Sequence, residues 1–472
     1  MSCFNLMGNK MGISEQIVAH IVNCRFEDIS KEIIEEKKKN ILDTLGVMIA
    51  GSSATGCDTV IDEILSIGGR KDAAIPSYAK KIPVHNAAIV NCMMARALDF
   101  DDVFPDSIIH IDATSIPTAF VISDFVKGVS GKQFLTAITV AADIAARMGL
   151  ANFIPSNISG YSFTFQFASI IAAIVSGKVM GLDCEKMQNA LGIAYSQLAG
   201  NNQGYVDGAM TIRLQQGLSA GAGVLAAILA RKGITGAKDI FSGKFGYYNV
   251  FAQGKYDPEL LTKEIGSTFY GTTNTIKPYP CCTHLHGAID GILDICEENN
   301  ISYQDVDKVE IGVNQSGYNI CCEPIEKKRR PKSIVDLQFS FNYVIAAALI
   351  EGKIDLDSFQ ESALKKSDIL DFGEKAVFPY VEERLNQGSN KSITKTDLKL
   401  ILADGRIFKK SVPYAKGSKK RPMAMHECEE KFKMCLKKAE RPIADESVDK
   451  AINGIKNFEE VDDVNQLYSI FC

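Results

Sequence analysis

The densest group of side chains able to do chemistry lies at Cys281, Cys282, His284 and His286. Cysteine and histidine are the usual ligands of zinc, which binds four of them at tetrahedral angles. Adjacent cysteines are poorly placed to share one tetrahedral ion, and no second ligand pair follows at a typical spacing. We therefore predict no metal here. A cysteine nucleophile would need a neighbouring base, which His284 could supply.

A second group is acidic. Asp99, Asp101 and Asp102 follow an apolar stretch, and His110 stands further on among isoleucines. Carboxylates and imidazole are the usual groups for moving a proton, so these residues are candidates for acid–base catalysis. An aspartate here can equally well cap a helix, and a single histidine in an apolar setting is more often structural. Residue type alone leaves both interpretations open.

Composition narrows the class of protein. A chain of 472 residues can bury two or more domain cores. The net charge of −5 argues against nucleic acid as a partner, because phosphate binding needs a concentrated cationic face. The 13 cysteines include no C-x-x-C pair and are typical of reduced thiols. With no signal peptide and no uninterrupted apolar span, we expect a cytoplasmic protein without a membrane partner.

The elements that must position these groups are mainly helical. Helix-spaced apolar residues predict helices over 11–24, 33–50, 86–98, 133–148, 165–180, 184–198 and 218–232, and again over 427–438, 445–458 and 464–471. Between them the pattern changes. Alternation predicts strands at 306–313, 398–402 and 406–412, the last two joined by an Asp404-Gly405 turn. Helices are expected over 333–351 and 358–367.

The fold class that follows is mainly α, in the order helical, mixed α+β and helical again. We place the first helical region at residues 1–275, the α+β region at 276–412 and the C-terminal helical region at 413–472.

Several short motifs occur in one order along the chain. They are ALDFDD at 97–102, KPYPCC at 277–282, DLQFSFNY at 336–343, DGR at 404–406, KGS at 416–418 and RPM at 421–423. Together they resemble the signatures of the MmgE/PrpD family, over residues 30 to 435. The resemblance implies that the two helical regions form one large all-helical domain built from both chain ends, with the α+β region inserted as a smaller lid domain. It also implies a homodimer and no metal or organic cofactor.

The resemblance also implies a site. Reactions in that family move a proton next to a carboxylate, which requires a base, an acid and cations that hold the developing charge. Three family positions fall on Asp99, His110 and Lys277, which we predict to be catalytic. For substrate binding we predict Arg213, which stands beside a family lysine position. The other predicted substrate-binding residues are Asp102, Ser162, Gln215 and Tyr318.

The chain departs from the family at three site positions. Val103, Ser162 and Ile212 stand where relatives carry Thr, His and Lys. A site without that imidazole and that ammonium should bind a tricarboxylate less tightly. An arginine can clamp a carboxylate but cannot act as a base near neutral pH.

The leading functional hypothesis is therefore a cofactor-independent lyase, a dehydratase or decarboxylase, acting on a small di- or tricarboxylate-like substrate. An epimerase or other isomerase would use the same deprotonation and return the proton to the other face. A non-catalytic relative that binds a metabolite is a third reading, because of Ser162 and Ile212.

Overall fold

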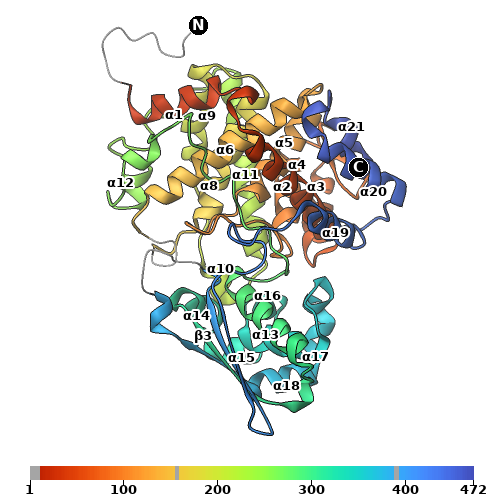
Figure 1. The fold of residues 1–472 in the computed structure, drawn as a ribbon. Helices are drawn as coiled ribbons and strands as arrows, with labels where there is room; N and C mark the ends of the chain where they lie inside the picture. The colour runs from red at the N-terminus through yellow and green to blue at the C-terminus, as the bar shows by residue number, and fades with distance from the viewer. Residues whose placement is uncertain (1–10, 155–158, 387–392) are drawn as a thin grey trace.

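The computed structural model describes residues 11–154, 159–386 and 393–472. The chain forms a larger helical part and a smaller part that contains a four-stranded sheet (Figure 1). Helices from both chain ends lie together in the larger part: α1 (Ile13–Asn23) and α2 (Lys31–Ala50) with α19 (Met425–Leu436), α20 (Asp445–Lys456) and α21 (Asn465–Tyr468). The fold is mainly α with a small α+β part, as predicted. The predicted domain limits stay predictions.

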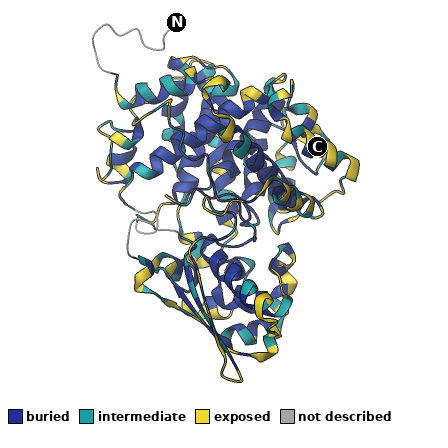
Figure 2. Ribbon diagram, in the orientation of Figure 1, coloured by how far each residue is buried: buried dark blue, intermediate teal, exposed yellow. Residues whose placement is uncertain are grey.

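The centre of the helical part is formed by helices that are apolar on all sides. They pack around α8 (Phe163–Val179), whose residues 163–177 are all buried. A helix without a polar face must be surrounded by other elements, and Figure 2 shows the buried residues concentrated on these central helices. The others in this part are α3 (Cys57–Ile67), α4 (Val84–Arg96), α5 (Asp112–Val126), α6 (Gly131–Ala151), α9 (Cys184–Tyr195), α10 (Gln203–Asp207), α11 (Thr211–Arg231) and α12 (Tyr247–Phe251).

The sheet has the strand order β4-β3-β5-β6. Strands β3 (Val306–Val313), β5 (Thr396–Leu402) and β6 (Ile407–Val412) confirm the predicted strands, and Gly405 supplies the left-handed backbone of the turn with φ +88°. Burial alternates along β5, because one face of the sheet packs on α13 (His286–Asn299). Strand β4 (Val377–Val381), which pairs in parallel with β3, was not predicted.

Three predicted elements differ clearly from the observed ones, and one hairpin was not predicted. The helix expected over 333–351 is two helices, α16 (Ile334–Gln338) and α17 (Phe341–Glu351), because the Ser340 side chain accepts from the Tyr343 N–H and caps a new start. The helix expected over 358–367 is two 3₁₀ turns, Leu356–Phe359 and Glu361–Lys365. Helix α11 begins seven residues before 218, and β1 (Ala73–Ile75) with β2 (Lys80–Ile82) forms an unexpected hairpin.

The remaining helices of the sheet-containing part are α14 (Gln315–Cys321), α15 (Ile325–Arg329) and α18 (Ser367–Ala376). The segment from α16 to the two 3₁₀ turns is the part of this unit that meets the helical part near residues 98 and 213.

Two described helices, α6 and α11, are long and apolar enough to cross a membrane by length and composition. Inside the protein, 94% of the apolar window of α6 and 61% of that of α11 is buried. The core helix of a soluble protein passes the same test. The expectation that the chain has no membrane partner stays a prediction.

Candidate active site

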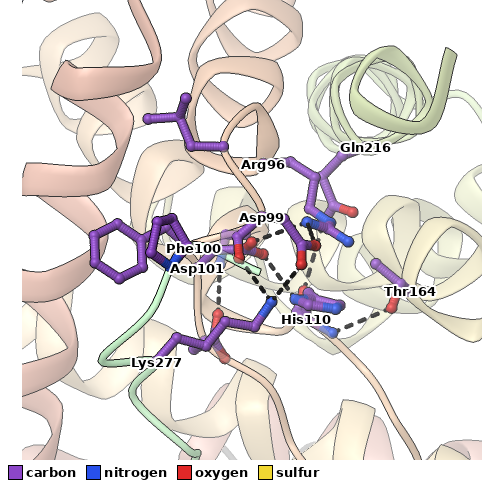
Figure 3. A network of polar contacts seen from close by, with 12 residues as sticks. Arg96, Asp99, Phe100, Asp101, His110, Thr164, Gln216 and Lys277 are labelled. Atoms are coloured by element: carbon purple, nitrogen blue, oxygen red, sulfur yellow. Dashed lines mark hydrogen bonds and ion pairs between the residues drawn. The ribbon is translucent and has the colours of Figure 1, made fainter. Parts of the chain in front are cut away.

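A cluster of buried charges forms directly after α4 (Figure 3). The helix ends at Arg96, and Asp99 adopts a left-handed backbone with φ +51°, which aspartate tolerates better than most residues but at a cost of about 1 kcal/mol or more. This turn directs two carboxylates at the Arg96 guanidinium. Its Nη1 donates to Asp99 Oδ1 at 2.6 Å and to Asp101 Oδ1 at 3.1 Å. All three side chains are almost completely buried.

His110 contacts the second of these carboxylates. Its Nδ1 lies 2.8 Å from Asp101 Oδ2. The backbone of His110 is held from two other helices, because its N–H donates to Thr164 Oγ1 at 3.2 Å and its carbonyl accepts from Gln216 Nε2 at 3.4 Å. Thr164 belongs to α8 and Gln216 to α11, so core helices fix the position of the imidazole.

The charge state of this pair decides what it can do. Burial would raise the pKa of Asp101, but Arg96 and His110 hold it below its ordinary value, so the carboxylate is ionised and can only accept. Burial and Arg96 lower the pKa of His110, so the imidazole is neutral near pH 7. A neutral imidazole facing an ionised carboxylate carries its proton on Nδ1. Nε2 then keeps its lone pair and can act as a base.

Lys277 completes the cluster from a segment far along the chain. A bridge between Val103 and Thr275 lays this segment against the acidic turn, and Ile276 N–H donates to the Gly417 carbonyl. Gly417 has φ +84°, and a Cβ there would lie 1.9 Å from the Ile276 oxygen, so only glycine fits. The Lys277 ammonium donates to the Asp99 carbonyl at 2.9 Å and to Asp99 Oδ2 at 3.1 Å. Burial would raise the pKa of Asp99, but Lys277 and Arg96 hold it below its ordinary value.

Asp102 lies behind this cluster. Its Oδ1 accepts the backbone N–H groups of Asp112 and Ala113 at the start of α5, and its Oδ2 accepts from Asn274 at 2.6 Å. Burial and the neighbouring Asp112 raise the pKa of Asp102 well above its ordinary value. These contacts position α5, and a substrate contact for Asp102 stays a prediction.

Two neighbouring cavities open beside the cluster, and Arg213 lines both. The inner one, about 10 Å³, is lined by Arg96, Asp99 and Ile212 among others. The outer one, about 160 Å³, lies between the helical part and the sheet-containing part. Within the described residues Arg213 forms no ion pair; its Nη1 donates to the Thr55 carbonyl at 3.4 Å. Burial lowers the pKa of Arg213. A buried arginine without a carboxylate is typical of an anion-binding position.

The other predicted substrate-binding residues lie elsewhere. Ser162 precedes α8, Gln215 binds the backbone of Asn201 through both its side-chain oxygen and nitrogen, and Tyr318 lies on α14. None of the three lines either cavity. His110, Asp101 and Lys277 do not line them either, so a substrate contact at Ser162, Gln215 and Tyr318 stays a prediction.

Arg96, a central residue, was missed from the sequence. It stands three residues before Asp99 at a helix end, a spacing at which opposite charges meet, and that signal was available. Asp101 was among the acidic candidates, but Asp102 and not Asp101 was predicted to lie in the site. No local signal separates the two, because the turn at Asp99 decides which carboxylate reaches His110.

The segment from Cys281 to His286 serves the packing of the sheet-containing part. Cys281 and Cys282 are buried free thiols, and burial raises the pKa of Cys281 well above its ordinary value. His286 Nε2 contacts the Cys281 carbonyl at 3.2 Å, and His284 Nδ1 contacts the Ile393 carbonyl at 2.9 Å. Among the described residues no group of three or more such ligands could hold a metal ion.

We expect His284 to make the fold sensitive to acid. Burial lowers its pKa to about 4, whereas in the unfolded chain it titrates at about 6.5. The folded state therefore binds fewer protons, and stability present above pH 6.5 is lost as the pH falls toward 4. The loss from this residue is about 3 kcal/mol. In denaturant unfolding between pH 7 and 4, the free energy of unfolding should decline less steeply with falling pH in His284→Gln than in the wild type.

His426→Gln is the control for this experiment, because His426 is exposed on α19. It should reproduce the wild-type profile. An unchanged profile in His284→Gln would contradict the assignment.

Comparison with known proteins agrees with the fold. The family model of the MmgE/PrpD N-terminal domain matches residues 15–259, and that of the MmgE/PrpD C-terminal domain matches residues 279–453. The chain is 24% identical to cis-aconitate decarboxylase of Aspergillus terreus, over 87% of this chain and 86% of the relative. It is 25% identical to the cis-aconitate decarboxylase-like protein oryM of Aspergillus oryzae, over 97% of each chain. Human cis-aconitate decarboxylase is 23% identical, over 97% of this chain and 94% of its own length.

Proposed function

Because the chain belongs to the MmgE/PrpD family, we propose that it is a cofactor-independent lyase, a decarboxylase or dehydratase, that transfers a proton next to a carboxylate of a small di- or tricarboxylate-like substrate. The names of its relatives support the decarboxylase type. The observation that carries the proposal is the buried cluster in which neutral His110 contacts ionised Asp101 and Lys277 pairs with Asp99, a residue that lines the inner cavity together with Arg213.

The residues divide the chemistry between them. His110 Nε2 exchanges a proton with the carbon next to the carboxylate, and Asp101 stabilises the imidazolium that forms when the proton is taken. Arg213 binds a substrate carboxylate. Lys277, with Arg96, counters the negative charge that develops when the C–H or C–C bond breaks. In a dehydration the same electrons then expel the β-hydroxyl, which leaves as water by taking from His110 the proton removed in the first step.

An epimerase is the second candidate, and the lowered pKa of His110 favours it to the same extent as a dehydratase. Both begin by removing a proton, for which a neutral imidazole is ready. A decarboxylase instead needs His110 protonated, to donate to the carbanion left by CO₂. The site therefore supports deprotonation first, whereas the relatives' names support decarboxylation.

Incubation of a panel of di- and tricarboxylates in D₂O separates these reactions. Release of CO₂, or formation of the unsaturated product of water loss, identifies a lyase, and deuterium in recovered substrate without net product identifies an isomerase. A carboxylate that binds without exchange or turnover would identify the non-catalytic relative and overturn the proposal.

We expect Arg213→Met to weaken carboxylate binding without destabilising the protein. The side chain pairs with no carboxylate among the described residues, so its removal leaves none of them buried and unpaired. A charged hydrogen bond to substrate contributes about 1.5–3 kcal/mol, which corresponds to roughly tenfold to 100-fold in Kd. Calorimetric titration gives Kd, and thermal unfolding of the free protein should show an unchanged or higher Tm. A lower Tm with unchanged Kd would assign Arg213 to the fold.

We also propose a homodimer. The outer face of α11 exposes Leu218 and Leu225, with exposed fractions of 52% and 36%, and exposed leucines in a row are more typical of an interface than of a free surface. A cytoplasmic location stays a prediction.

A further inference from the structure

The outer cavity is a continuation of the candidate site. Arg213 and Gln338 line both cavities, and Leu98, next to Asp99, lines the outer one. Gln338 is fixed at the boundary, because its Nε2 donates to the Leu98 carbonyl at 2.7 Å and to the Pro280 carbonyl at 3.3 Å. A carboxylate bound to Arg213 would therefore lie between Asp99, on the inner side, and the outer cavity.

Both apolar and polar side chains line the outer cavity, the polar ones besides Arg213 being Ser53, Thr55, Gln338, Gln360, Glu361 and Lys438. Leu98 from the helical part faces Ile334, Leu356 and Phe359 from the sheet-containing part. The cation at its rim, Lys438, is already paired with Asp357. A polar or charged substituent placed against these side chains would lose its hydration without gaining a partner.

The inner cavity is also partly apolar. Ile212, Val335 and Phe339 lie across from Arg96 and Asp99. Arg213 is the one cation at the junction that no described carboxylate pairs with, since Lys277 and Arg96 both bind Asp99. Arg213 thus suits a carboxylate, and the apolar side chains of the wall, which include Leu98, Ile334, Leu356 and Phe359, suit hydrocarbon.

We propose that the substrate is an amphipathic carboxylic acid, whose head group binds Arg213 and whose alkyl or aryl substituent fills the outer cavity. An apolar cavity of about 150 Å³ accepts benzene, so a substituent of up to about six carbons fits the 160 Å³ present here. This inference rests on the proposed function, because it names the substrate class of the same site.

The test compares two probes with the same head group, succinate and n-butylsuccinate, by calorimetric titration against the full chain. Each buried methylene improves affinity about threefold to fourfold, so n-butylsuccinate should bind on the order of 100-fold more tightly. Ala54→Leu adds a larger side chain to the lining of the outer cavity, so it should reduce the affinity advantage of n-butylsuccinate over succinate to under about threefold. The affinity for succinate itself should stay within about twofold of wild type.

Two further variants serve as an alternative to Ala54→Leu and as a control. Ser53 is exposed on the same wall, so Ser53→Leu should reduce the advantage even if Ala54→Leu folds poorly. Ala403 is exposed in the β5–β6 turn, outside both cavities, so Ala403→Leu should retain the full advantage.

The possible failures are distinct. If succinate binds with dependence on Arg213 but the butyl chain adds nothing, or if the advantage persists in Ala54→Leu, the inference is wrong and the proposed function stands. If neither probe binds with dependence on Arg213 and no carboxylate is turned over, the proposed function fails and the inference fails with it.

Discussion

Replacing Asp101 with asparagine should lower kcat by about 10³-fold to 10⁴-fold, with little change in the KM for a carboxylate substrate. The carboxylate holds the His110 proton on Nδ1, 2.8 Å away, and so keeps Nε2 free. An asparagine amide can donate to Nδ1 instead, which moves the proton to Nε2 and removes the base. Steady-state kinetics on the substrate identified in the D₂O panel measures the effect.

The chain contains a matched control. Asp143 on α6 is a buried aspartate that also contacts a histidine, His20 at 3.2 Å, and an arginine, Arg147 at 2.9 Å. Asp143→Asn removes the same kind of charge away from the cavities, so it should lower stability but leave kcat per folded molecule within about twofold. Equal losses of kcat in Asp101→Asn and Asp143→Asn would show that Asp101 contributes only to folding.

The pH profile of kcat/KM tests whether His110, held by Asp101, is the catalytic base. Since burial and Arg96 lower the pKa of His110, the acid limb of kcat/KM should lie below pH 6.5 in the wild type. In Asp101→Asn the residual activity should no longer follow that limb. Retention of the wild-type limb would show that another group is the base.

Arg96→Met should reduce the free energy of unfolding at pH 7 by about 3–5 kcal/mol, the cost of leaving buried carboxylates without their partner. Arg96 donates to both Asp99 and Asp101, and all three side chains are buried. After its removal Lys277 is the remaining cation on Asp99. Denaturant unfolding at constant pH measures the loss.

The loss of unfolding free energy in Arg96→Met should become smaller at acid pH. Asp99 and Asp101 have pKa values held below their ordinary value, so their pairing stabilises the fold above about pH 4 and is lost as the pH falls through the folded-state pKa values. Arg96→Met weakens that pairing, so the gap between wild type and variant should narrow in acid. Arg213→Met, which removes a buried arginine without an ion pair, is the control and should show no such gap. A gap independent of pH would assign the effect of Arg96 to packing.

Much of the architecture could be predicted from local pattern. The alternation of Leu398, Leu400 and Leu402 with the Asp404-Gly405 turn identified the β5–β6 hairpin, because side chains of a strand packed on one face repeat every two residues. The break at Ser340 could not be predicted in the same way. Apolar residues continue through it, and only the capping contact to Tyr343 separates α16 from α17.

The sequence by itself determined the family, the helical core and three members of the candidate site, because Asp99, His110 and Lys277 lie in motifs that can be read without a structure. Tertiary structure decided the rest. The left-handed turn at Asp99 selected Asp101 over Asp102 as the partner of His110, and Arg96 was brought to both Asp99 and Asp101 by the end of α4. The outer cavity joins residues 54 and 359, which are distant in sequence. Such contacts follow from how two packed units meet, which no local pattern encodes.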